Sequence, residues 1–242
     1  MLQRILIATI SLWACSSLVA FADPKDDLQS ALQKLADSPN YSWVTTVEGG
    51  FGRGPMNGKT QKDGLTWFSM QMRDNDVEMV IKGDKIAIKT EDGWKSASEI
   101  ESADDGDQPS PGRFAVMMAR NLKGPAAQSL DMADKLVNVK PTADGFSADL
   151  SQAQAEQALT FRRRPTTNPD SDAPQISVRN AKGSVTYTAK DGEVTKIVMH
   201  VTGTVTFNDN DRDVDRTTTT EIKDVGTTSI DVPADAKAKL GS

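Results

Sequence analysis

The spacing of apolar residues changes along the chain and predicts where helices give way to strands. Residues 26–37 place apolar side chains every three or four positions, which is typical of an amphipathic helix with one buried stripe. The stripe consists of Leu28, Ala31, Leu32, Leu35 and Ala36. Ser38 and Pro39 follow and end the helix. Between Tyr41 and Thr90 apolar and polar residues alternate instead, which predicts strands.

These alternating runs predict a sheet with one apolar face. Residues 41–50 form the first predicted strand, and the stretches LTWFSMQMR, VEMVIKG and KIAIKT form three more, separated by the turn sequences KGD and DGW. Alternation places these apolar side chains together: Phe68, Met70, Met72, Val77, Met79, Ile81, Ile86 and Ile88. An antiparallel sheet of this kind needs a cover over its apolar face. The cover is either a layer of helices or a bound apolar ligand.

The middle of the chain returns to helical spacing after an acidic, turn-rich stretch at residues 102–112. In chain order, the predicted elements are a helix at residues 113–122, a helix at 125–136, a hairpin at 137–151 and a short helix at 151–159. Ser151 is the expected N-cap of the last helix. Residues 162–175 contain three prolines among mostly polar side chains, which predicts a mobile loop.

The last third consists of predicted strands again. Residues 183–207 predict a hairpin that turns at Lys190, Asp191 and Gly192. On its second strand, one predicted face holds Ile197, Met199, Val201, Val205 and Phe207, and the other holds Val194, Lys196, Val198, His200, Thr202 and Thr204. A threonine-rich strand and a terminal helical turn follow. The chain therefore predicts an α+β fold in which short helices cover an antiparallel sheet.

The first 22 residues have the pattern of an export signal. Arg4 supplies the positive charge, and the apolar run that follows is short for a membrane span. Ala20 and Ala22 satisfy the small-x-small rule for cleavage, so we expect a mature chain that starts at Asp23 and is released as a soluble periplasmic protein. The alternative is a lipid anchor on Cys15, although bulky Trp13 stands where a lipid-attachment box usually has a small residue.

Composition limits what the mature chain does. The whole chain has 242 residues and a net charge of −6; removal of residues 1–22 takes away Arg4 and no acid, leaving 220 residues and a charge of −7. That length suits a single domain over residues 23–242 with a sizeable core. Such an acidic chain is a poor binder of nucleic acid. Without Cys15 it contains no cysteine, which excludes disulfides and thiol chemistry.

The motifs that suggest chemistry are all incomplete. His200 is the only histidine and has no evident partner to orient its ring. The glycine-rich residues 49–54 precede a strand-like run rather than the helix that a phosphate loop needs. Residues 209–215 alternate acids but lack the glycine and glutamate of a calcium loop, and Arg162–Arg164 form an isolated basic cluster. We therefore expect no metal, no cofactor and no enzymatic activity.

Methionines are frequent on the predicted apolar faces. Their flexible thioethers suit ordinary core packing and equally suit an adaptable surface for an apolar ligand. The candidate lining residues of such a cavity are Trp43, Phe68, Met70, Met72, Val77, Met79, Ile81, Ile86, Ile88, Phe114, Met117, Met118, Ile197, Met199 and Val201. Both interpretations remain open at this point.

The end of the chain resembles that of the LolA/LppX-like carriers of bacterial envelopes. The similarity rests on Val225-Gly226-Thr227, on the short strand Ser229 to Val232 with Pro233 after it, and on the alanine-rich turn Ala234 to Leu240. It extends to the order of an export signal, an opening helix, a strand meander, a helical middle and a closing meander. The resemblance implies a strongly curved, half-open antiparallel sheet, or half-barrel, with helices over its concave side and an apolar cavity for acyl chains.

Two functions fit these observations. The first is an exported envelope protein that binds or carries a lipid, a lipoprotein acyl chain or another apolar ligand under the sheet. The second is a non-enzymatic envelope sensor or protein-interaction module with the same fold, a filled core and an envelope protein as its partner. A secreted hydrolase ranks last, because the sequence has no nucleophile motif and no pair of carboxylates with distinctive spacing.

Overall fold

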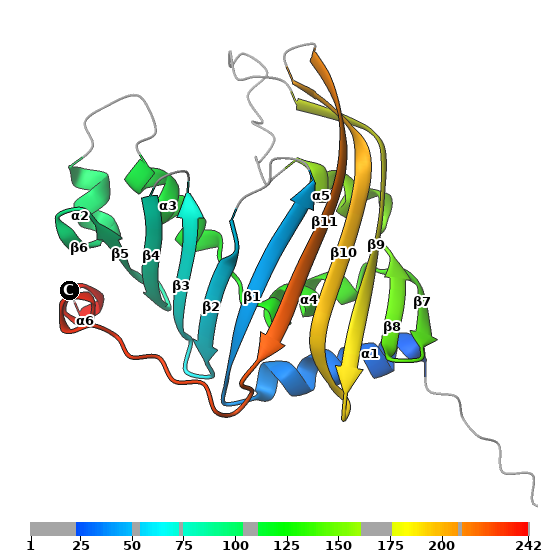
Figure 1. Ribbon diagram of the computed structural model, residues 1–242, viewed down its shortest axis with the longest axis horizontal. Helices are drawn as coiled ribbons and strands as arrows, with labels where there is room; N and C mark the ends of the chain where they lie inside the picture. Colours follow the sequence, from blue (N-terminus) through cyan, green and yellow to red (C-terminus); the bar gives the residue numbers. More distant parts are fainter. Residues whose placement is uncertain are drawn as a thin grey trace, which may run out of the picture.

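The computed structural model describes residues 23–49, 54–72, 75–103, 111–160, 176–207 and 210–241. All the described strands belong to one antiparallel sheet, in the order β6-β5-β4-β3-β2-β1-β11-β10-β9-β8-β7 (Figure 1). The first six are β1 (Asn40–Gly49), β2 (Met56–Gln61), β3 (Leu65–Met72), β4 (Asn75–Lys82), β5 (Lys85–Thr90) and β6 (Gly93–Ser96). The other five are β7 (Val137–Thr142), β8 (Gly145–Asp149), β9 (Ile176–Lys190), β10 (Glu193–Phe207) and β11 (Asn210–Lys223).

The sheet consists of two meanders joined in the middle. The pairing of β1 with β11, which sets Trp43 opposite Ile222, connects the N-terminal strands to the C-terminal ones. The outermost strands, β6 and β7, are not paired with each other, so the sheet is open and does not close into a barrel. The predicted fold class, an α+β fold with an open antiparallel sheet, is confirmed.

Six described helices accompany the sheet. They are α1 (Pro24–Asp37), α2 (Ala97–Ser102), α3 (Pro111–Asn121), α4 (Pro125–Ala133), α5 (Gln152–Leu159) and α6 (Ala234–Gly241). In α1, the Asp23 side chain accepts a hydrogen bond from the Lys25 amide, and Leu28, Leu32 and Leu35 are fully buried. The predicted amphipathic helix is therefore present, and it begins two residues earlier than the pattern indicated because Pro24 occupies its first turn.

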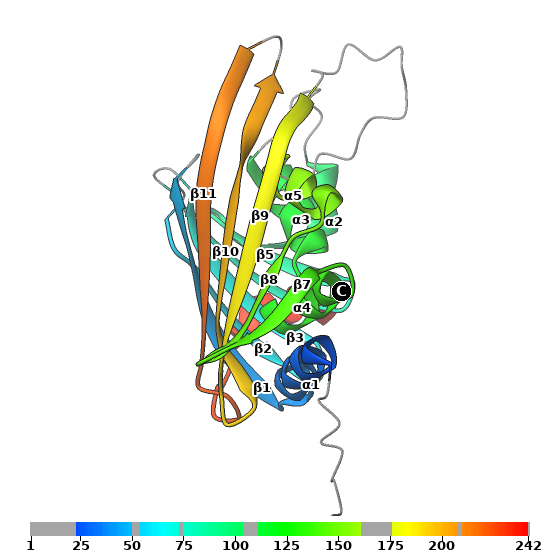
Figure 2. The same cartoon turned by 90° about the vertical axis from the view of Figure 1, so that its right-hand side faces the viewer.

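Helices α1 to α5 lie on one side of the sheet, which we call the inner face (Figure 2). Cross-strand partners share a face, and the inner face runs across the N-terminal strands through Trp43, Gly58, Phe68, Met79 and Ile88. Helices α1, α4 and α5 pack over the C-terminal strands, whereas α2 and α3 pack over β4 and β5. The inner face thus has two separate helical covers.

The chain after β11 covers part of the opposite, outer face. This C-terminal segment, residues 224–241, is tied to the start of β1, where the Asn40 carbonyl accepts from the Gly226 amide at 2.8 Å. Its helix α6 packs against β5 and β6. Val232 and Ala236 are buried there against Val80 and Ala87. Strands β4 and β5 therefore have apolar side chains on both faces, although their alternation predicted only one.

The predicted face of Val194 on β10 is wrong because the strand contains a bulge. Alternation placed Val194 opposite to Ile197, yet both are buried in the same inner cluster. The pairing of β10 with β9 shifts between Val194 and Lys196, which leaves Thr195 as an extra residue. One inserted residue reverses the side-chain alternation on the strand, so Val194 reaches the inner face.

Two short elements have no counterpart in the predictions. Strand β6 and helix α2 follow β5, and they meet at Ser96, the N-cap of α2. Ser96 and Glu99 form a capping box, in which each side chain bonds the backbone of the other. The Ser-x-x-Glu spacing that produces it is visible in the sequence and is a general helix-start signal.

Several expectations concern residues outside the described ranges. They are the export signal at residues 1–22 with Cys15, the whole basic and proline-rich stretch at 162–175, and residues 50–53. None of the described helices is long and apolar enough to cross a membrane.

Candidate functional site

The inner face carries two clusters of buried apolar side chains, each under its own helices. The α4 cluster consists of Leu28, Ala31, Leu32, Leu35, Tyr41, Trp43, Ala126, Ala133, Leu136, Ala148, Leu150, Ala155, Leu159, Ala181, Val185, Tyr187, Val194, Ile197, Val201, Val214 and Ile222. The α3 cluster consists of Phe68, Met70, Met79, Ile86, Ile88, Ile100, Ala115, Val116 and Ala119. These clusters are the only extensive apolar surfaces that the described helices cover on this face.

Twelve of the fifteen candidate lining residues belong to the two clusters or pack against them. Trp43, Ile197 and Val201 belong to the α4 cluster, and Met199 packs against it. Phe68, Met70, Met79, Ile86 and Ile88 belong to the α3 cluster, and Val77, Ile81 and Met118 pack against it. Phe114 is half-buried on α3, and Met117 on the same helix is 55% exposed. Met72 ends β3, and its side chain lies outside the described part.

Trp43 stands at the boundary between the two clusters. Its ring lies directly over Gly58 of β2, where a Cβ atom would come within 2.0 Å of the indole Cζ2 atom. Only glycine leaves room for the indole at this strand position. Trp43 is 4% exposed, and its neighbour across β2 is Phe68 of the α3 cluster. The sequence shows this glycine but not its partner, because the contact depends on strand register.

Few polar side chains face inward. Thr45 and Thr220 share a 2.8 Å hydrogen bond between β1 and β11. Arg216 is 5% exposed and donates to the Ala158 carbonyl near the end of α5. Burial lowers the pKa of the Arg216 guanidinium, while its position at a helix C-terminus favours positive charge. Arg216 therefore holds α5 against the sheet.

Both tyrosines of the chain lie beneath α4. The Tyr41 hydroxyl accepts a hydrogen bond from the Ala126 amide at 3.3 Å, and this contact replaces a side-chain cap at the start of α4. The Tyr187 hydroxyl is buried and forms no hydrogen bond within the described structure. Burial raises the pKa of Tyr187, while the neighbouring Ser129 hydroxyl acts in the opposite direction without reaching hydrogen-bonding geometry. The sequence-based candidates included neither tyrosine.

The two hollows that stand out in the described structure are polar. The larger is an open groove of about 860 Å³ between the outward sides of α1 and α4. It is lined by Asp26, Gln29, Ser30, Gln33, Lys34, Asp37, Leu130, Asp131 and Asp134. The smaller, about 190 Å³, lies between β1, β2 and the C-terminal segment. Neither is an apolar cavity beneath the sheet.

Parts of the motifs set aside in the sequence lie within the described residues. His200 has a partner that the sequence did not reveal: its Nε2 atom lies 2.8 Å from the Asp215 carboxylate, on the exposed outer face. Gly49 ends β1, and β2 follows rather than a helix, as predicted. Within the described ranges, no three His, Cys, Asp or Glu side chains gather as metal ligands.

Comparison with known proteins gives structural likenesses only. No family model matches the chain, and no curated protein matches it. Among solved structures, it is similar to the lipoprotein LppX of Mycobacterium tuberculosis, with a TM-score of 0.47 and 9% identity over 87% of this chain and 98% of that chain. It is also similar to LprF of Mycobacterium bovis, with a TM-score of 0.45 and 11% identity over 88% and 97% of the two chains.

Proposed function

We propose that this protein is a non-enzymatic envelope protein that binds an acyl chain, or another apolar ligand of similar shape, on the inner face of its sheet. One observation carries the proposal: the apolar inner face extends over both meanders, and only short, separate helices cover it. A second sheet would bury such a face permanently. Short helices separate from a sheet more readily, because each buries little area.

The cover formed by α4 is the part best suited to opening. This helix has nine residues, and small side chains, Ala126, Ser129 and Ala133, form its buried side. Its polar attachments are few: the Ala126 amide donates to the Tyr41 hydroxyl, the Gln154 side chain donates to the Met132 carbonyl, and Lys25 and Gln29 donate to Asp134 at the end of the helix. An acyl chain that displaces α4 outward would take the place of the small apolar side chains of α4 against the sheet.

The α3 cluster offers a second, more deformable part of the same surface. Met70 and Met79 are buried in it, and Met56 and Met118 pack at its edge. Unbranched thioether side chains adapt their shape at low energetic cost. We propose that the twelve candidate residues in or against these two clusters contribute to binding, with Trp43 at the boundary between the clusters.

Export completes the proposal. We propose cleavage after Ala22 and release into the periplasm, with lipid attachment at Cys15 as the alternative. Fractionation of cells that produce the Cys15→Ser variant distinguishes the two. Identical distribution of parent and variant is expected, and loss of membrane association in the variant would establish the anchor instead.

Native mass spectrometry of the mature protein purified from its own cells tests ligand binding. We expect a bound species whose mass corresponds to a lipid, released on denaturation, together with uptake of a fluorescent fatty acid by the delipidated protein. Absence of both would refute the proposal.

The second candidate, an interaction module with a filled core, is favoured by one observation. The inner side chains are packed, and both described hollows are polar. Under this alternative the protein binds no lipid and captures the same envelope protein in repeated pull-downs. A lipid-bearing protein that captures no such partner would exclude it.

A further inference from the structure

Tyr187 places a hydroxyl group inside the α4 cluster without a hydrogen-bond partner. The residue is fully buried on β9, opposite Ile197 of β10 and Phe146 of β8. Its hydroxyl oxygen forms no hydrogen bond within the described residues. Buried polar groups are paired in the great majority of cases, so an unpaired one needs an explanation.

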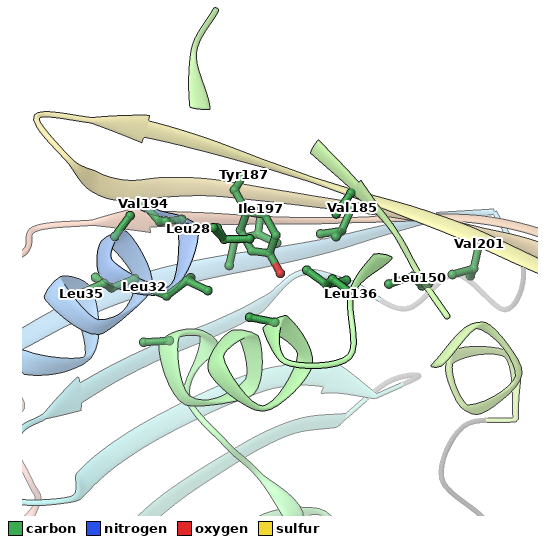
Figure 3. Close-up of a cluster of buried hydrophobic side chains, with 14 of the residues drawn as sticks. Leu28, Leu32, Leu35, Leu136, Leu150, Val185, Tyr187, Val194, Ile197 and Val201 are labelled. Carbon is green, nitrogen blue, oxygen red and sulfur yellow. The ribbon is translucent and has the colours of Figure 1, made fainter. Parts of the chain in front are cut away.

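The hydroxyl points at the cover rather than into the sheet. In Figure 3 the ring of Tyr187 extends from β9, and its oxygen lies on the side of α4. The polar side chain of α4 that neighbours this hydroxyl is Ser129. Ser129 is 2% exposed and lies between the buried Ala126 and Ala133. The polar atom is thus located at the place where the helix would have to move.

Stability does not account for this hydroxyl. Phenylalanine would fill the same space without an unsatisfied donor, and replacing an unpaired polar group by an apolar one is neutral or stabilising. Tyr41 is a useful comparison in the same cluster, because its hydroxyl bonds the Ala126 amide and fixes the start of α4. Of the two hydroxyls, that of Tyr41 forms a hydrogen bond to α4, whereas that of Tyr187 has the Ser129 hydroxyl as its polar neighbour on α4 but does not reach hydrogen-bonding geometry with it.

We propose that Tyr187 is the polar anchor of the binding site and donates a hydrogen bond to the carbonyl oxygen of an acyl ligand that enters between α4 and the sheet. This inference rests on the proposed function and specifies its ligand. The anchor is neutral, and its neighbours Ile197, Phe146 and Ser129 carry no charge. A buried carboxylate would need a cationic partner, so the ligand is an ester or amide rather than an ionised fatty acid.

The Tyr187→Phe variant separates this anchor from general apolar binding. The full mature chain, delipidated, is titrated with three probes: methyl palmitate, palmitic acid at neutral pH, and hexadecane, which has no oxygen. We expect Tyr187→Phe to weaken methyl palmitate binding about 3- to 10-fold, the equivalent of one neutral hydrogen bond. Hexadecane binding stays unchanged, and the parent binds the ester more tightly than the ionised acid.

Thermal unfolding without ligand provides the structural control. Tyr187→Phe keeps or raises the melting temperature, whereas Tyr41→Phe lowers it by about 2–4 °C through loss of its bond to α4. A fall in Tyr187→Phe as large as that in Tyr41→Phe would show that its hydroxyl is paired, and this would overturn the anchor. Ser129→Ala serves as a second variant, with a smaller loss of ester affinity expected.

The remaining outcomes are distinct. If the parent binds the ester and Tyr187→Phe binds it equally well, the anchor is refuted while the proposed function stands. Equal weakening for ester and hexadecane would also refute it, because the effect would then be one of shape. If the parent binds none of the probes, the proposed function itself fails, and the anchor fails with it.

Discussion

Strands β4 and β10 belong to the same sheet but are buried in different ways. On β4, Met79 faces inward and Val80 outward, and both are fully buried. On β10 the buried residues, including Ile197 and Val201, all face inward, and His200 on the outer face is exposed. The N-terminal strands are thus held from both sides, and the C-terminal strands are covered on the inner side alone.

The difference bears on our proposal that a ligand enters beneath a helical cover. Helix α6 on the outer face is linked to α2 on the inner side by a 2.5 Å ion pair between Lys239 and Glu99. Layers on both faces therefore fix β4 to β6. Over the C-terminal strands, movement of α4 exposes the inner face without disturbing a second layer. This asymmetry is why we place the polar anchor beneath α4.

The largest loss of stability is expected when a charged side chain is introduced on β4, which is covered on both faces. Val80→Asp buries a carboxylate between the sheet and the C-terminal segment, and we expect a loss of more than about 4 kcal/mol in the free energy of unfolding. Val198→Asp is the matched control on the outer face of β10, where the residue is only half-buried. It should cost about 1 kcal/mol, as a poor strand former does. Equal losses in urea unfolding would contradict the comparison.

The boundary between the clusters provides the next test. Gly58→Ala places a methyl group against the indole of Trp43, and overpacking of this kind costs about 1–3 kcal/mol. Gly54→Ala is the control, because its new Cβ would come no closer than 3.4 Å to Gln71. Tryptophan emission should shift in Gly58→Ala only. An unchanged spectrum and stability would show that Trp43 moves freely at this position.

The stability that the Lys239–Glu99 ion pair between α6 and α2 contributes should depend on pH. The Lys239 ammonium and the Ser96 backbone amide hold the pKa of Glu99 at about 2, well below its ordinary value. Because the folded-state pKa is lower than that of the unfolded chain, the contribution to stability is complete above about pH 4.5 and disappears as the pH falls toward 2.

Lys239→Met should therefore unfold at a lower temperature than the parent at pH 7, and the difference should vanish near pH 2. Lys237→Met, on the exposed side of the same helix, is the control and should match the parent at both pH values. A difference between Lys239→Met and the parent that persists at low pH would assign the effect to packing instead.

The smallest effect is expected on the outer face of β10. Both side chains of the His200–Asp215 pair are exposed, and exposed ion pairs contribute little to stability. His200→Gln should change the free energy of unfolding by less than about 0.5 kcal/mol and leave ligand binding unaltered. A substantial loss of binding would reveal a role for this face that its exposure does not suggest.

The sequence predicted most elements because each depends on local spacing. The stripe of α1, the Asp191-Gly192 turn, with both residues at positive φ, and the Ser151 cap of α5 are all local features. The second buried face of β4 depends on a segment about 150 residues later in the chain and was therefore not predictable from alternation. The same holds for Val194, whose direction is set by a bulge.

The candidate site was predictable only in part. Apolar periodicity correctly identified side chains such as Phe68 and Ile197 as inward-facing, because face assignment follows alternation. It gave no reason to select Tyr187, since an unpaired hydroxyl is defined by three-dimensional surroundings. The division of the inner face at Trp43 and Gly58 likewise depends on strand register, which the spacing of residues leaves undetermined.

The most direct test of ligand binding on the inner face is fluorescence quenching in two single-tryptophan proteins. Among residues 23–242, Trp43 lies on the inner face, and Trp67 and Trp94 pack on the outer face against the cluster of Val80, Ala87, Val232 and Ala236. Phenylalanine at the other two positions leaves Trp43 alone in one protein and Trp67 alone in the other. A methyl ester with a brominated acyl chain is added below its aggregation limit. The account predicts saturable quenching of Trp43 and none of Trp67; quenching of Trp67 alone, or of both equally, would contradict it.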